Sequence, residues 1–247
     1  MKQHKFLATA IFAAGMSLFL YSCNGSGEGE KTAEVKPEAE APKTTETPAP
    51  PVAVMPSNFL IIKHKVANYA KWQPVFDAND SIKLANGLTN YVVGRGTGSD
   101  SNTLLVAFKM ADVNKAKALS ASPELKSRMQ KSGVIGKPTF NYVETLTMDT
   151  TTNASTVRLI VMHKVKDWDA WKKEFDSHKQ TRIDGGLTDR AIGHEAGDTH
   201  MVTLVFAVND MAKAKAFTTS KDLKDKMMAA GVVGPPTMFF YNVVKKY

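Results

Sequence analysis

The sequence contains a single cysteine, Cys23, among its 247 residues. A chain with one thiol cannot form an internal disulfide or a cluster of cysteine ligands. The sequence also lacks a glycine-rich phosphate loop, the G-x-S-x-G turn of serine hydrolases and the HExxH signature of zinc proteases. These absences exclude the enzyme classes that depend on such motifs. They leave open any chemistry that needs none of them.

Long apolar runs are scarce as well, and the clearest one lies at the N-terminus. Lys2 and Lys5 precede an apolar run from Phe6 to Leu20. This run is short for a membrane span and has no stop-transfer flank, which is typical of a secretory signal. We therefore predict a signal peptide over residues 1–22.

The solitary cysteine directly follows that run. The junction Leu20-Tyr21-Ser22-Cys23 resembles a bacterial lipoprotein signal. This resemblance implies that Cys23 is lipidated and that the protein is anchored to a membrane. The Asn24 that follows resembles the sorting signal of outer-membrane lipoproteins. We expect a lipid-anchored cell-envelope protein, on the periplasmic face of the outer membrane or on the cell surface.

Residues 23–57 are rich in Gly, Glu, Lys, Thr, Ala and Pro and contain few large apolar side chains. Such a segment cannot bury enough surface to fold, so we predict a disordered linker. The whole chain carries a formal net charge of +8. A basic protein suggests nucleic acid as a partner, but the export signal argues against it. Many of the lysines also fall on predicted helix faces, where they are solvated.

The chain after the linker repeats itself. FLIIKHKV at residues 59–66 returns as RLIVMHKV at residues 158–165, and SGVIGKPTF returns later as AGVVGPPTM. The offset is about 99 residues in the first half of each copy and about 98 in the second. We infer two copies of one module, over residues 58–148 and 156–247.

The sequence pattern of each copy predicts the order strand, long helix, strand, strand, helix, strand. Residues 157–165 alternate with a period of two, as a strand does. The long helix that follows carries its aromatic residues and two polar ones on one stripe, and Gly185 and Gly186 end it. The members of this stripe are Trp168, Trp171, Phe175, His178 and Arg182.

This order is ferredoxin-like, an α+β fold with a four-stranded antiparallel sheet and both helices on one face. The other face of each sheet carries apolar residues such as Phe59, Ile61, Ile160 and Met162. A module of this size with a bare apolar face is poorly stable alone. We therefore expect the two bare faces to pack against each other.

The topology and the run from HKV through the aromatic helix to GV-x-G-x-P resemble the dimeric α+β barrel superfamily, which includes antibiotic-biosynthesis-monooxygenase-like and EthD-like proteins. The resemblance covers about residues 58–247. It implies that the usual homodimer is fused into one chain, an intramolecular pseudo-dimeric barrel that is a monomer. Ligands of this superfamily usually bind between the sheet and the helices of one module. That placement brings His64 opposite Trp72 and His163 opposite Trp171.

The two copies differ at two polar positions of the helical stripe. Asn79 and Lys83 in the first copy correspond to His178 and Arg182 in the second. An aromatic wall, a titratable base and a fixed cation suit a planar anionic ligand, so we predict the stronger pocket in the second copy. The alternative is structural: the aromatic residues form the core and each histidine hydrogen-bonds a neighbour.

The sequence leaves two further roles for histidine residues open. His178 could act as an acid or base or, as in haem-degrading relatives, as an axial ligand. His194 and His200 bracket a turn and could hold a metal together with Glu195 or Asp198. Nothing else in the chain specifies haem or a metal, so we predict neither a metal nor a cofactor.

Two functions therefore compete. The first is a lipid-anchored envelope protein whose barrel binds a small aromatic or anionic ligand. The second is a cofactor-independent monooxygenase-like enzyme that acts on such a molecule. A perturbed histidine among converging polar groups would favour the enzyme, whereas pockets filled by tryptophan and phenylalanine would favour a binding or structural module.

Overall fold

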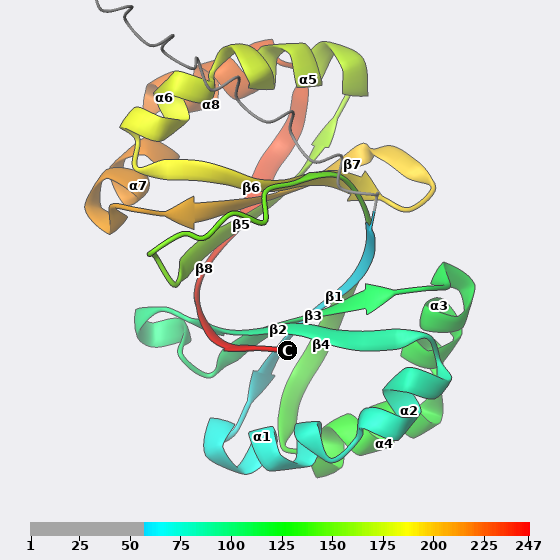
Figure 1. The fold of residues 1–247 in the computed structure, drawn as a ribbon. Helices are drawn as coiled ribbons and strands as arrows, with labels where there is room; N and C mark the ends of the chain where they lie inside the picture. The colour runs from blue at the N-terminus through cyan, green and yellow to red at the C-terminus, as the bar shows by residue number, and fades with distance from the viewer. Residues whose placement is uncertain (1–56) are drawn as a thin grey trace, which may run out of the picture. The chain divides into compact units, whose positions relative to one another are not determined.

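The computed structural model describes residues 57–247 (Figure 1). The predicted signal peptide, Cys23 and the predicted linker up to Pro56 lie outside the described residues. The first copy of the repeat, called module one, contains β1 (Ser57–Val66), α1 (Tyr69–Asp77), α2 (Asp80–Ala85), β2 (Leu88–Gly96), a 3-10 turn (Gly98–Asp100), β3 (Thr103–Met110), α3 (Val113–Ala121), α4 (Pro123–Lys131) and β4 (Val134–Met148). The second copy, called module two, contains β5 (Val157–Val165), α5 (Trp168–Ser177), α6 (Lys179–Asp184), β6 (Leu187–Glu195), β7 (Asp198–Val208), α7 (Met211–Thr218), α8 (Lys221–Ala229) and β8 (Val232–Lys246).

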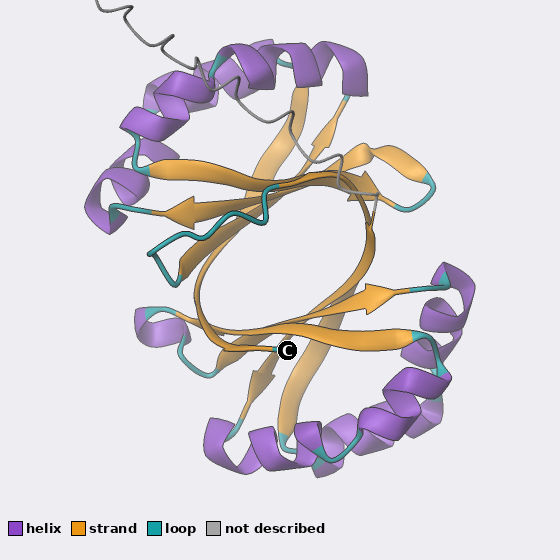
Figure 2. Cartoon of the chain, viewed as in Figure 1, coloured by secondary structure: helices purple, strands orange, loops and turns teal. Residues whose placement is uncertain are grey.

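Each module forms a four-stranded antiparallel sheet with its helices on the outer face (Figure 2). The strand order is β4-β1-β3-β2 in module one and β8-β5-β7-β6 in module two. Two further pairings, β2 with β8 and β4 with β6, join the edges of the sheets into a closed barrel. The predicted fold is confirmed: two tandem ferredoxin-like modules form one intramolecular pseudo-dimeric α+β barrel.

Side-chain caps define where the helices begin. The Asp167 carboxylate accepts a hydrogen bond from the Ala170 amide, and the Asn68 side chain accepts one from Lys71. Ser122 caps α4 and Ser220 caps α8 in the same way. Because the caps recur at equivalent positions, both modules direct their helices across the sheet at the same points.

Three apolar clusters hold the described part of the chain together. Two lie between the helices and the sheet of one module, and they centre on Trp72 and Trp171. The third lies between the two sheets, inside the barrel, and includes Phe59, Ile61 and Ile160. The bare sheet faces therefore cover each other as predicted.

The barrel closes because β4 and β8 are long. Each has 15 residues, and its final part leaves its own sheet and pairs with the other module. Thr145 of β4 pairs with Gly193 of β6, and Val243 of β8 pairs with Gly94 of β2. The two junctions between the sheets therefore each contain a glycine from equivalent positions of the repeat.

Neither junction position has room for a side chain, so both need glycine. A Cβ atom on Gly94 would lie 2.2 Å from the Tyr241 ring, and one on Gly193 would lie 2.3 Å from the Glu144 carbonyl oxygen. Real Cβ atoms do not approach other atoms this closely, so a side chain at either position would push the strands apart.

We expect Gly193→Ala to lower the free energy of unfolding by about 1–3 kcal/mol, because the new methyl group overlaps backbone of the neighbouring strand and not a flexible side chain. Urea unfolding measures this change. Thr199→Ala, at an exposed position of the same hairpin, is the control and should change stability by less than about 0.5 kcal/mol. Equal stability of the two variants would contradict this account of the junction.

The first helix of each copy is shorter than predicted. We expected one continuous helix from Trp168 through Arg182, but His178 ends α5 and begins α6. The buried Arg182 guanidinium donates to the Phe175 carbonyl at this break. A charged side chain thereby stabilises a kink that the apolar periodicity did not reveal.

Two prolines lie near the start of β8, which begins at Val232, ahead of Pro235 and Pro236. The pairing with β5 shifts register between Met162 and Lys164, and an irregularity of this kind tolerates residues without an N–H group.

No helix within residues 57–247 combines the length and apolarity needed to cross a membrane.

Candidate functional site

Each module contains a cavity of about 90 Å³ between its helices and its sheet. In module two the residues that line it include His163, Trp171, His178 and Arg182. In module one they include His64, Trp72, Asn79 and Lys83. The structure thus brings together the predicted site residues of each copy. A dry cavity of about 150 Å³ admits benzene in another protein, so these smaller pockets suit at most a single ring.

The alternation of β1 and β5 places one histidine of each module against the helices. His163 lies between Val161 and Val165, which are both buried on the same face of β5. Its ring centroid is 5.5 Å from that of Trp171. The equivalent distance from His64 to Trp72 is 5.6 Å.

These two histidines have no hydrogen-bond partner. Nδ1 and Nε2 of both His64 and His163 are buried and unpaired within the described residues. Burial lowers the pKa of each ring to about 4, so both are neutral at pH 7. The structural alternative is therefore wrong about the histidines, which bond no neighbour within the described residues, but its other part is confirmed, because Trp72 and Trp171 belong to the apolar core. A neutral imidazole offers one donor and one acceptor, and no residue of the described part of the chain uses either one.

A stack of aromatic rings forms the helical wall of each pocket. In module two the ring centroids of Trp168 and Trp171 are 5.2 Å apart, and Trp171 lies 5.1 Å from Phe175. In module one Trp72 stacks on Phe76 at 4.6 Å. Trp171 and Phe175 line the module-two pocket directly, and Trp72 and Phe76 line the module-one pocket.

Arg182 is not the free cation that we predicted. Its Nε and Nη2 atoms donate to the Asp189 carboxylate at 2.8 and 2.7 Å, its Nη1 atom donates to the Phe175 carbonyl, and its guanidinium lies 3.6 Å from the centroid of the Phe175 ring. All of these donors are occupied and the charge is neutralised. The prediction of an anionic ligand in this pocket therefore loses its main support.

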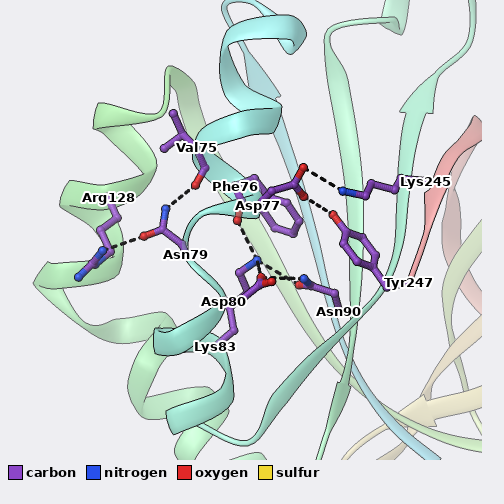
Figure 3. A network of polar contacts seen from close by, with 10 residues as sticks. All are labelled: Val75, Phe76, Asp77, Asn79, Asp80, Lys83, Asn90, Arg128, Lys245 and Tyr247. Carbon is purple, nitrogen blue, oxygen red and sulfur yellow. Dashed lines mark hydrogen bonds and ion pairs between the residues drawn. The ribbon is translucent and has the colours of Figure 1, made fainter.

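Lys83 plays the same part in module one (Figure 3). Its Nζ atom donates to the Phe76 carbonyl at 2.8 Å, to Asp80 at 2.6 Å and to Asn90 at 3.1 Å. Asn90 is the repeat equivalent of Asp189. Both copies therefore use a buried, paired cation to brace the kink between their first two helical segments.

The rims of the two pockets differ. Asn79 in module one donates to the Val75 carbonyl and accepts from Arg128 at 2.8 Å, which links α4 to the kink beside α1 (Figure 3). The equivalent of Asn79 is His178, whose half-buried ring makes no hydrogen bond to residues 57–247. The equivalent of Arg128 is Lys226, which pairs with Asp222 on its own helix. The module-two rim is thus not bridged, although the two cavities have the same volume.

The hairpin histidines do not form a metal site. The Nδ1 atom of His194 lies 3.1 Å from the Glu195 carbonyl oxygen, and His200 contacts Asp198. The Glu195 carboxylate instead accepts the Tyr142 amide of β4. No group of three metal-binding side chains occurs in the described part of the chain.

Two features of these sites escaped the sequence analysis. Asp189, the acid that neutralises Arg182, stands where the first copy has Asn90, so a comparison of the copies could have found it. The second feature is a buried arginine, Arg158, which points into the barrel. The sequence does contain a clue to Arg158. It stands at the start of the repeated strand, where the first copy has Phe59.

No family model matches the sequence, and neither does any curated protein. Solved structures do resemble the fold. An anthrone oxidase-like protein aligns with a TM-score of 0.50 at 13% identity, over 77% of this chain and 92% of its own. A monooxygenase-like protein from Listeria innocua aligns at 0.42 and 10% identity, over 78% and 96%. A heme-binding protein from Thermus thermophilus aligns at 0.46 and 11% identity, over 77% and 92%.

At these identities the likeness is one of fold. The chain has the fold of the dimeric α+β barrel superfamily, as the repeat predicted, with both halves of the barrel in one polypeptide. Any role in binding has to be argued from the residues of this chain.

Proposed function

We propose that this protein binds a small, uncharged, mainly aromatic molecule in the pocket of module two. The observation that carries the proposal is His163, a buried imidazole whose two nitrogens have no partner within the described residues, beside a pocket whose exposed surface is mainly apolar. An unpaired buried polar group costs about 1–3 kcal/mol. A ligand that pairs with the ring removes this penalty on binding.

The chemistry of the pocket restricts the ligand. The Trp171 and Phe175 rings favour a flat apolar body, and the neutral His163 ring favours one hydroxyl or carbonyl group. Because Asp189 neutralises Arg182, a carboxylate on the ligand would have no free cation to meet. A single ring with one hydroxyl group, as in phenol, satisfies all three conditions.

Module two is proposed as the stronger site because no hydrogen bond joins the side chains at its rim within the described residues. In module one the Asn79–Arg128 hydrogen bond joins two residues that line the pocket, and we expect it to hinder the entry of a ligand. His178 has no such bond and can move aside or add a second polar contact. This supports the predicted asymmetry on grounds of access, whereas the sequence analysis based it on charge.

The alternative, a cofactor-independent monooxygenase-like enzyme, has less support. Such chemistry needs a base whose pKa lies near the working pH. Burial lowers the pKa of His163 to about 4, which makes the ring a weak base. A neutral donor and acceptor of this kind suits binding better than proton removal.

Thermal unfolding with and without phenol tests the proposal. We expect phenol to raise the melting temperature of the native protein in a concentration-dependent manner, since a ligand of the folded state stabilises it. His163→Leu should be more stable than the native protein without phenol and should lose the response to phenol. His64→Leu is the matched control and should retain most of the response. A full phenol response in His163→Leu would refute the site.

We further propose that Cys23 carries a lipid that holds this barrel at a membrane of the cell envelope. The signal-like junction before the cysteine supports this. Cys23→Ala should move the protein from the membrane fraction to the soluble fraction, because stable anchoring depends on several acyl chains. Fractionation followed by immunoblotting measures this. A variant that stays in the membrane fraction after a high-salt wash would contradict the anchor.

A further inference from the structure

The interior of the barrel contains a second kind of cavity. Its volume is about 140 Å³, and it lies between the two sheets, apart from the helix-covered pockets. Phe59, Ile61 and Ile160 form part of an apolar wall. Arg158 and Arg190 also line it, so this cavity combines apolar and cationic surfaces.

Arg158 is a buried cation without a counter-ion. Only 8% of its surface is exposed. Its Nη1 atom donates to the carbonyls of Ser155 and Val157 at 2.7 and 2.8 Å. Its Nε and Nη2 atoms have no partner, and no carboxylate pairs with it, within residues 57–247. A buried charge without a counter-ion destabilises the folded state, because its hydrogen bonds replace only part of the hydration that it loses.

The fold does not require this arginine. The equivalent residue of module one is Phe59, which lies on the same inner face of the barrel and is buried. Other polar lining residues also replace apolar ones across the repeat: Thr203 stands for Leu105, and Thr145 stands where the other copy has Val243. The polar character of this cavity is thus a departure from the symmetric pattern and not a consequence of it.

The surrounding groups leave the cavity positive. Arg190 is neutralised by Asp149, which lies 2.7 Å from its Nη1 atom. Arg158 keeps its charge, although burial and the nearby Arg190 lower its pKa and Tyr241 opposes them. Thr145 and Thr203 are buried beside the cavity, and their hydroxyl groups make no hydrogen bond to residues 57–247. Free donors therefore surround the uncompensated charge of Arg158, and the exposed Lys246 lines the same cavity.

We propose that the barrel interior binds a small monocarboxylate on Arg158. The free Nε and Nη2 atoms form the planar fork that matches both oxygens of a carboxylate. The apolar wall would receive the remainder of the ligand. A cavity of this volume is close to one that admits benzene, so the ligand is a carboxylate with no more than one ring. This site is independent of the phenol-type pocket around His163.

Calorimetric titration of the native protein with benzoate tests this site. We expect saturable binding of benzoate and none of benzyl alcohol, which has the same ring without the charge. Arg158→Met should weaken benzoate binding by roughly ten- to a hundredfold, because two charge-assisted hydrogen bonds are lost. Arg158→Lys should restore only part of the affinity, since an ammonium cannot form the planar fork.

Two controls separate this site from other sources of binding. Arg95→Met removes a cation of β2 that does not line the cavity, and it should leave benzoate binding unchanged. His163→Leu should leave it unchanged as well, which distinguishes failure of this proposal from failure of the proposed function. Arg158→Met should also unfold at a higher temperature than the ligand-free native protein. Benzoate binding that survives in Arg158→Met, or absence of benzoate binding to the native protein, would overturn the inference.

Discussion

A fall in pH from 7 to 4 should remove roughly 6 kcal/mol of folding stability through two side chains, His64 and His163. Both rings have an ordinary pKa of 6.5, which burial lowers to about 4 in the folded protein. Between these values the unfolded chain binds protons that the folded chain does not. The free energy of unfolding therefore falls as the pH drops below 6.5, and most of the loss has occurred by pH 4.

This loss of stability is large compared with the total stability of a typical domain. Each ring contributes roughly 3 kcal/mol, and typical domains are stable by only about 5–15 kcal/mol in total. We therefore expect the barrel to unfold in mild acid. Urea unfolding at a series of pH values measures the slope. The double variant His64→Leu/His163→Leu should show a much flatter profile, whereas carboxylates titrate alike in both proteins. Parallel profiles would show that the rings are not buried without partners.

Separating the modules should abolish the native fold of each as a monomer. A chain that ends at Thr150 exposes the module-one side of the inner apolar cluster, including Phe59 and Ile61. It also leaves the ends of β2 and β4 without the strands that pair with them. Exposed apolar faces and free strand edges favour association with a second copy.

The C-terminus adds a polar link that the same truncation removes. Asp77 at the end of α1 receives hydrogen bonds from Lys245 at 2.9 Å and Tyr247 at 2.6 Å (Figure 3). Light scattering coupled to gel filtration should show that the truncated chain is a dimer or larger, or circular dichroism should show that it is unfolded. A stable, folded monomer would contradict the cooperative barrel.

Much of the fold followed from the sequence because it depends on patterns that the repeat displays twice. The period-2 alternation of residues 157–165 and the recurrence of HKV predicted the strands, and the resemblance to the dimeric α+β barrel superfamily placed His64 and His163 opposite the helices. The apolar residues of the opposite face, such as Phe59 and Ile160, predicted the packing of the two sheets. Two copies of one pattern made each inference safer than a single copy would have.

The missed features depend on contacts that a sequence does not display. The kink at His178 is stabilised by Arg182 and Asp189, and the pairing of these two side chains became visible only when α6 and β6 were placed together. The free cation likewise proved to be Arg158 and not Arg182. Both arginines differ from the first copy, but only the three-dimensional arrangement shows which of them has an acid beside it.

The three tryptophans of the chain provide the most direct test of the proposed pocket. Their indole N–H groups give one nuclear magnetic resonance signal each, which single substitutions assign to Trp72, Trp168 and Trp171. On titration with phenol at pH 7, we expect the Trp171 signal to shift first and to saturate, with a smaller and later change at Trp72. The same titration of His163→Leu should leave Trp171 unmoved. A Trp171 signal that does not respond to phenol in the native protein would contradict the account.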